Sequence, residues 1–322
     1  MQAAPSPDLT HNGAVEGIVV LCGGVGAARF LSGLLSVTDP AQVTAVVNVA
    51  DDDRFYGLHV SPDIDTVLYT LAGLVHEEQG WGRREETYHL QEELARLGAE
   101  TWFRLGDRDL ATHVLRTEAL AKGETLTTIT DRMRRSLGIG ARILPATNAL
   151  QKTEVRTDAG WIAFQEYFVR RRGADAVHEL RFVPEASPTP EVLRAIADAA
   201  MVVIAPSNPF VSIGPILALH GLREALHDAS ATVVAVSPIV AGAAIKGPAA
   251  AMLASLGHEV SALGVARLYA GIADVFVLDE SDAALLPAVQ ELGLRAVAVP
   301  TLMRDAGTRA ALAAATLSAA AG

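Results

Sequence analysis

Hydrophobic residues along the chain form short uninterrupted runs that are separated by longer amphipathic stretches. Six runs are rich in valine, isoleucine and alanine, which is typical of strands buried on both faces. They are 17–22 (GIVVLC), 43–50 (VTAVVNVA), 201–205, 232–236, 275–278 and 295–299. Most of the stretches between them have apolar residues at helical spacing, namely 27–35, 62–74, 213–226, 248–256, 282–292 and an alanine-rich C-terminal segment. Strands that alternate with helices in this way predict an α/β fold with a doubly wound, mostly parallel sheet.

Residues from about 80 to 184 depart from this alternation. Helical spacing at 85–97, 107–121 and 128–137 gives way to a period of two, and a turn of sequence DAG separates strands at 155–157 and 161–164. We therefore expect one Rossmann-like α/β domain over 17–322, with a mainly helical insertion at about 80–184 that bears a β-hairpin. Residues 1–16 have no targeting pattern, so we expect a disordered leader there.

Composition and charge exclude several classes of function. The 322 residues are 50% hydrophobic, enough for a full core, yet the longest uncharged apolar stretch is too short to span a membrane. A formal net charge of −11 opposes binding to nucleic acids and to anionic membranes. Cys22 is the sole cysteine, which excludes an internal disulfide and fits a reducing, cytoplasmic location. No lysine ends a Walker phosphate loop, and a metal, if bound, must be held by carboxylates.

Ligands of doubly wound sheets bind beyond the carboxyl ends of the strands, so the segments after each predicted strand are candidate sites. The first is the glycine turn 23–29 (GGVGAAR), where Gly24 and Gly26 would let backbone N–H groups approach an anion and Arg29 follows one turn on. The alternative is a tight turn with no ligand. The dinucleotide-binding fingerprint requires a third glycine where this chain has Arg29.

The second candidate is the acidic run 48–53 (NVADDD), which is followed by SPDIDT at a helix start. Three adjacent carboxylates repel one another unless water or a cation separates them. Helix capping would account for one aspartate of SPDIDT. A Mg²⁺ ion held by Asp51 and Asp63, with Asp65 beside them, would account for both groups together.

Two further segments follow later strands. In SNPFVSIGP, the hydroxyls of Ser207 and Ser212, the Asn208 amide and the helix start near Gly214 suit a phosphate or a purine edge, although Ser212 could be only an N-cap. Lys246 lies in the apolar segment AAIKGP, which favours a role in binding an anion over an exposed position on the surface.

The insertion contains a further candidate, the segment WFRLGDRD at 102–109. Trp102 and Arg104 could stack on a flat heterocycle, and packing in the core with a solvated Arg/Asp surface accounts for the segment equally well.

Together, CGGVGAARFLSGL, the acidic run with SPDIDTVLYTLAGL, FRLGDRDLATH, SNPFVSIGPIL and SPIVAGAAIKGPAAAM resemble the 2-phospho-L-lactate transferase family of coenzyme F-420 biosynthesis, from about 17 to 300. The resemblance implies transfer of a phospholactyl or phosphoenolpyruvyl group from a guanylyl diphosphate donor to the ribityl hydroxyl of a 5-deazariboflavin, with release of GMP, assistance by Mg²⁺ and a homodimeric enzyme. It places metal and acceptor near Asp51, Asp63 and Asp65, and Arg104 beside the acceptor. It places the donor near Gly24, Gly26, Ser207 and Asn208.

One departure from the family pattern leaves an alternative open. The family's acidic run usually follows Thr-Gly, whereas this chain has Val49-Ala50, as do related nucleotide-sugar-binding regulatory proteins. A non-catalytic regulator is therefore the second hypothesis, and an NAD(P)-dependent oxidoreductase a distant third. As a transferase, the chain would use Asp51 and Asp63 for Mg²⁺, the glycine turn and Lys246 against the phosphates, and Asp65 to orient or deprotonate the hydroxyl.

Overall fold

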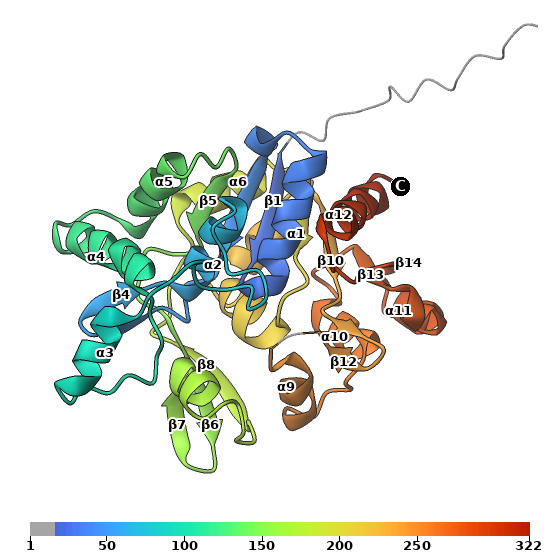
Figure 1. The fold of residues 1–322 in the computed structure, drawn as a ribbon. Coiled ribbons are helices and arrows are strands. Elements are labelled where there is room, and N and C mark those ends of the chain that lie inside the picture. The colour runs from blue at the N-terminus through green and yellow to red at the C-terminus, as the bar shows by residue number, and fades with distance from the viewer. Residues whose placement is uncertain (1–16, 246) are drawn as a thin grey trace, which may run out of the picture.

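The central sheet has seven strands, and all of them run parallel, as the hydrophobic runs predict (Figure 1). The computed structural model describes residues 17–245 and 247–322, so the expected leader lies outside the described residues. In spatial order the strands are β14 (Arg295–Val299), β13 (Val275–Asp279), β10 (Thr232–Val236), β9 (Met201–Ile204), β1 (Ile18–Cys22), β2 (Val43–Val47) and β5 (Arg142–Pro145).

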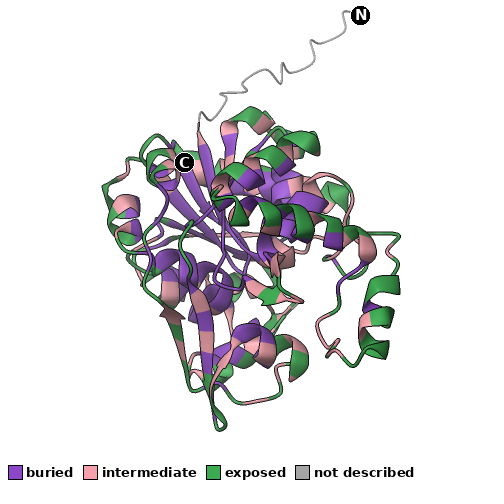
Figure 2. Cartoon of the chain, turned by 90° about the vertical axis from the view of Figure 1, so that its left-hand side faces the viewer, coloured by how far each residue is buried: buried purple, intermediate pink, exposed green. Residues whose placement is uncertain are grey.

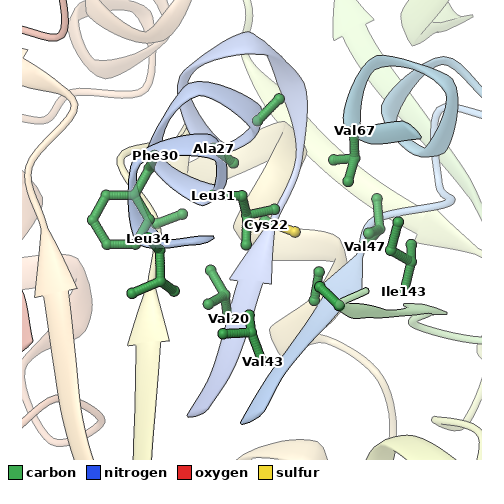
Figure 3. Close-up of a cluster of buried hydrophobic side chains, with 14 of the residues drawn as sticks. Val20, Cys22, Ala27, Phe30, Leu31, Leu34, Val43, Val47, Val67 and Ile143 are labelled. Atoms are coloured by element: carbon green, nitrogen blue, oxygen red, sulfur yellow. The ribbon is translucent and has the colours of Figure 1, made fainter. Parts of the chain in front are cut away.

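Each strand in the middle of the sheet is hydrophobic on both faces because a layer of helices covers each face. Val20 and Cys22 of β1 belong to one buried cluster, part of which Figure 3 shows, while Val19 and Leu21 belong to the opposite cluster. Helices α1 (Gly24–Val37), α2 (Pro62–Leu71), α5 (Leu126–Ser136) and α12 (Ala306–Ala321) contribute to the first cluster. Helices α6 (Pro190–Ala197), α7 (Gly214–Leu217), α8 (Leu222–Asp228), α9 (Ala249–Ser255), α10 (Ala262–Tyr269) and α11 (Leu286–Gln290) contribute to the second.

The chain reverses its direction of winding at β1. From β1 it moves outward through β2 to β5, and it then returns to β9 on the other side of β1 and continues outward through β10 and β13 to β14. The carboxyl ends of β1 and β9 thus flank the point where the strand order switches, which is the usual ligand site of this architecture. The glycine turn follows β1, and SNPFVSIGP follows β9.

The segment expected to be one insertion is divided by β5, which joins the edge of the central sheet beside β2. The first part holds α3 (His89–Arg96), α4 (Asp107–Ala121) and α5. The second holds a three-stranded antiparallel sheet of β6 (Lys152–Thr157), β7 (Gly160–Ala163) and β8 (Glu179–Val183), in which β6 and β7 form the predicted hairpin. Sequence analysis did not predict β5 because this four-residue run begins with a charged arginine and ends in a proline, which argues against a central strand.

Other local predictions also need correction. The helix expected at 213–226 is two helices, α7 and α8, because Gly221 adopts a left-handed conformation (φ +84°) between them. The acidic run leads into an unpredicted hairpin of β3 (Asp53–Phe55) and β4 (Leu58–Val60), and a second small hairpin joins β11 (Ile239–Val240) to β12 (Ala243–Ala244). Helices α6 and α10 were not predicted either.

Burial follows the layered arrangement. Figure 2 shows buried residues concentrated in the central strands and on the inner sides of the surrounding helices, with exposed residues on the outside. Within residues 17–245 and 247–322, no helix has the length and the apolar character needed to cross a membrane.

Candidate functional site

The two loops at the switch point are in direct contact. Ser207 Oγ donates a hydrogen bond to the backbone oxygen of Gly23, at 2.9 Å. A Cβ on Gly26 would lie 2.3 Å from the backbone oxygen of Pro206, so only glycine allows α1 to approach the loop after β9 this closely. The structure thus brings the glycine turn with Gly24 and Gly26 against the loop that carries Ser207.

An aspartate from α2 closes the glycine turn. The N–H of Gly24, at the first residue of α1, donates to Asp63 Oδ1 at 2.8 Å. A Cβ on Gly23 would lie 2.5 Å from Asp63 Oδ2 and 2.9 Å from Ser212 Cβ. Asp63 and Ser212 therefore converge on the turn, and α1 begins against a carboxylate, as the helix dipole favours.

Asn48, at the start of the acidic run, holds Asp63 from the other side. Its Nδ2 donates to Asp63 Oδ2 at 2.9 Å and to the backbone oxygen of Val211 at 3.2 Å, and its Oδ1 accepts the N–H of Ala50. One amide thus connects the loop after β2, the start of α2 and the turn after β9. Sequence analysis placed Asn48 in the acidic run but gave it no role.

Three carboxylates, those of Asp51, Asp52 and Asp63, are each only 7% exposed. Asp51 Oδ1 and Asp52 Oδ1 are buried and have no hydrogen-bond partner among the described residues. Such orphaned carboxylate oxygens are costly unless a cation or a proton compensates them. A hard cation such as Mg²⁺ would compensate these oxygens, and proteins usually bind Mg²⁺ through one or two carboxylates together with substrate phosphates.

The pKa values in this group reflect the same crowding. Burial, together with the neighbouring Asp63 and Asp52 carboxylates, holds the pKa of Asp51 well above its usual range. Burial also raises the pKa of Asp63 to about 6, although the hydrogen bonds from Asn48 and Gly24 favour its ionised form. These carboxylates resist joint ionisation without a cation.

Two residues that sequence analysis missed hold Asp52. Ser61 Oγ donates to Asp52 Oδ2 at 2.6 Å, and His59 Nε2 lies 3.0 Å from the same oxygen. Burial raises the pKa of Asp52, and the contacts with His59 and Ser61 oppose that rise. His59 belongs to the unpredicted hairpin, so no pattern in the sequence pointed to it.

Asp65 does not share in the group of Asp51, Asp52 and Asp63 as expected. Both of its oxygens bind the guanidinium of Arg116, a residue of α4 that is 0% exposed. His113 Nδ1 lies 3.7 Å from Asp65 Oδ2, and His113 Nε2 lies 3.3 Å from Asp109 Oδ2. Potential metal-ligand atoms of Asp65, Asp109 and His113 lie within 4.8 Å of one another, but the Arg116 guanidinium already supplies the cation there. We interpret this set as a buried ion-pair network.

The segment after β9 starts a π-helical turn, Pro209–Ile213, that Asn208 caps. Asn208 Oδ1 accepts the N–H groups of Phe210 and Val211, so Asn208, and not Ser212, is the N-cap. Ser212 is buried beside the glycine turn. A Cβ on Gly214 would lie 3.0 Å from the backbone oxygen of Pro209, which gives Gly214 a packing role in this turn.

The remaining predicted residues make contacts of their own or lie outside the described part of the chain. Trp102 packs edge-on against Phe55 of β3, and Arg104 lies 3.9 Å above the ring of Tyr88. Arg29 Nη2 contacts the backbone oxygen of Glu77 at 3.5 Å rather than the glycine turn. Lys246 is outside the described residues.

Comparison with known proteins follows this geometry. The family model described as 2-phospho-L-lactate transferase CofD matches residues 18–312. Phosphoenolpyruvate transferases of Streptomyces griseus and Streptomyces coelicolor are each 44% identical over 92% of this chain, and cover 96% and 95% of their own lengths. A solved structure of a UPF0052 family protein from Bacillus halodurans superposes with a TM-score of 0.62 at 18% identity, over 94% of this chain and 99% of that one. That likeness concerns the fold alone.

Proposed function

Because this chain belongs to the 2-phospho-L-lactate transferase family, we propose that it transfers a phosphoenolpyruvyl or 2-phospholactyl group to the ribityl hydroxyl of 7,8-didemethyl-8-hydroxy-5-deazariboflavin in coenzyme F-420 biosynthesis. The donor is the corresponding guanylyl diphosphate, and GMP leaves. The name that the Streptomyces relatives carry favours the phosphoenolpyruvyl group.

The proposed step forms one bond to phosphorus and breaks another. The ribityl oxygen bonds to the phosphorus that carries the enolpyruvyl group, and the bond from that phosphorus to the bridging oxygen breaks. The bridging oxygen leaves with GMP and keeps the electron pair, while the hydroxyl proton passes to a carboxylate. Such transfers need chiefly alignment and compensation of charge, with little covalent chemistry from the protein.

The observation that carries the proposal is the pair of buried, orphaned oxygens on Asp51 and Asp52 beside the switch point. Asp51 and Asp63 would hold Mg²⁺, which when bound neutralises charge on the diphosphate oxygens. Asp63 also keeps the glycine turn in place through the N–H of Gly24.

The donor-binding residues follow from the contacts around α1. The N–H groups at the start of α1 beyond Gly24, near Gly26, would donate to the diphosphate, with Ser207 and Ser212 beside them. Asn208 caps the neighbouring turn and so shapes this side of the site. Contacts of Arg29, Gly214 and Lys246 with the donor stay predictions.

Acceptor binding and proton transfer are assigned separately. Trp102 and Arg104 remain our candidates for the deazaflavin ring. Trp102 packs against Phe55 in the hairpin that follows the acidic run, and Arg104 stacks on the ring of Tyr88. We replace Asp65 as proton acceptor by Asp52, because Arg116 binds both oxygens of Asp65 while Asp52 Oδ1 has no partner within the described part of the chain.

One experiment tests the proposed reaction. The purified protein is incubated with the deazariboflavin, Mg²⁺ and either guanylyl phosphoenolpyruvate or guanylyl phospholactate, and the acceptor is examined by mass spectrometry. We expect a mass gain of one enolpyruvyl or lactyl phosphate and stoichiometric GMP. Tight nucleotide binding without any product would instead support the regulatory alternative, and an NADH titration serves as the control for the oxidoreductase.

The homodimer and the cytoplasmic location also stay predictions. Several apolar residues of the insertion helices are exposed and could meet a second copy, namely Leu90, Leu97, Val114 and Leu115. Sedimentation velocity across a concentration series would establish the oligomeric state.

A further inference from the structure

One fully buried guanidinium connects helix α4 to the segments that carry the acidic group, that is, the carboxylates of Asp51, Asp52 and Asp63. Arg116 binds both oxygens of Asp65 in the first turn of α2, two residues from Asp63. Its Nη1 also approaches the backbone oxygen of His59 in β4 at 3.4 Å. One side chain therefore joins α4 to the turn that carries Asp63 and to the strand that carries His59.

A second contact from α4 fixes His59 from its N–H side. Thr117 Oγ1 accepts the N–H of His59 at 2.7 Å and donates its own proton to the backbone oxygen of His113. His59 in turn places its Nε2 at 3.0 Å from Asp52 Oδ2. Neighbouring residues of α4 thus hold Asp63 through Asp65, and Asp52 through His59.

The positive charge of Arg116 favours the ionised carboxylates that its hydrogen bonds help to position. The carboxylates of Asp65 and Asp52 both interact with the charge of Arg116. Burial raises the pKa of Asp52, and the positive charge of Arg116 is among the contacts that oppose this rise. A planar guanidinium can bind both oxygens of Asp65 and still reach a third acceptor, which a lysine ammonium cannot reproduce.

We propose that Arg116 is a positioning residue that sets the separation between the first turn of α2 and strand β4. At this separation, Asp63 faces the cation and Asp52 faces the hydroxyl of the acceptor. This inference rests on the proposed function for the identity of the cation. The positioning comes from the insertion and not from the sheet, although the acidic residues themselves lie at the sheet's carboxyl edge.

The test compares Arg116→Lys with wild type and with Arg132→Lys, a matched control in which the arginine pairs with Glu124 on the surface. Circular dichroism and urea unfolding establish that each variant folds. Hydrogen exchange of peptides covering residues 52–66 reports on positioning without any metal. Mn²⁺ binding to the substrate-free protein, followed by electron paramagnetic resonance, reports on the carboxylates, and steady-state kinetics separates kcat from the KM of the donor.

We expect a folded Arg116→Lys variant with faster exchange at 59–65, Mn²⁺ affinity and kcat reduced about 10- to 100-fold, and a donor KM near that of wild type. Wild-type exchange and wild-type Mn²⁺ affinity in that folded variant would overturn the proposal. If Arg116→Lys does not fold, Thr117→Val is judged by the same measurements; it removes the acceptor for the His59 N–H, together with the hydrogen bond from Thr117 to the His113 backbone oxygen. If wild type binds no Mn²⁺, the metal of the proposed function is wrong, and the exchange data still decide the role of Arg116.

Discussion

The unusual residues of this protein are carboxylates that lack their ordinary partners. Asp51, Asp52 and Asp63 come from a loop and a helix start, and each is nearly buried. The hydrogen bonds from Asn48 and Gly24 favour an ionised Asp63, but burial outweighs them. At the residue scale, burial therefore raises the pKa values of all three carboxylates and disfavours their joint ionisation.

The first prediction concerns the pH dependence that Asp63 imposes. Its pKa rises from 3.8 to about 6 on folding, so the native state holds this proton more tightly than the unfolded state. The contribution of this group is present in full below about pH 4 and is lost as the pH rises through 6. Relative to Asp63→Asn, wild type without divalent cations should lose on the order of 3 kcal/mol of unfolding free energy between pH 4 and pH 7.

Urea titrations of both proteins in chelator-treated buffers measure this difference. The Asn variant cannot titrate at position 63, so it serves as the control for ionisable groups outside the site. The Asp51 carboxylate, whose pKa the Asp63 charge raises, is relieved of that effect in the variant and belongs to the measured difference. A difference between the two proteins that stays constant from pH 4 to pH 7 would show that Asp63 titrates normally.

At the scale of elements, the site depends on how closely α1 approaches the loop after β9. Gly26 faces the backbone oxygen of Pro206, and Ser207 bonds to Gly23. Glycine is therefore needed in this turn so that two segments far apart in the sequence can pack closely, in addition to any role in binding phosphate.

We predict that Gly26→Ala destabilises the protein by about 1–3 kcal/mol, because the new Cβ would lie 2.3 Å from the Pro206 oxygen. Gly307→Ala is the matched control, since Gly307 also lies in the first turn of a helix, α12, and its Cβ would only contact Asp305 Oδ1 at 3.5 Å. The control should be neutral or slightly stabilising, as alanine is the better helix former. Equal unfolding midpoints for the two variants in urea would contradict the crowding.

At the scale of the whole molecule, the two winding directions of the sheet bring the acidic loop, the glycine turn and the segment after β9 to one edge (Figure 1). The first part of the insertion adds α4, which anchors the acidic group from outside the sheet. A ligand that joins these parts should stabilise the entire domain.

We predict that Mg²⁺ raises the melting temperature at pH 7.5. At about 100 times the dissociation constant, a ligand specific for the native state adds about 2.7 kcal/mol, which corresponds to a rise of roughly 4 °C for a domain of this size. Asp51→Asn should abolish the rise, whereas Glu291→Gln, an exposed residue of the α11 end, should keep it. Scanning fluorimetry at constant ionic strength provides the measurement, and an equal rise in the Asp51→Asn variant would exclude Asp51 as a ligand.

The sequence by itself determined the fold class and the strand ends at which the candidate residues lie. Hydrophobic runs of β-branched residues need burial on both faces, so they specify central parallel strands, and glycine and aspartate runs after those strands mark their carboxyl ends. The motifs also carried the family resemblance, which the comparisons confirmed. These signals are local in the sequence, so they can be recognised without knowledge of any tertiary contact.

Only the tertiary structure decided how the polar residues are paired. It assigned Asp65 to Arg116, Asp52 to His59 and Asp63 to Asn48, and it divided the expected insertion by placing β5 in the sheet. Arg116 lies 51 residues from Asp65, and an arginine on an amphipathic helix reads as a solvated side chain until its burial is known. The partners of buried charges are set by long-range packing, which no local period or motif encodes.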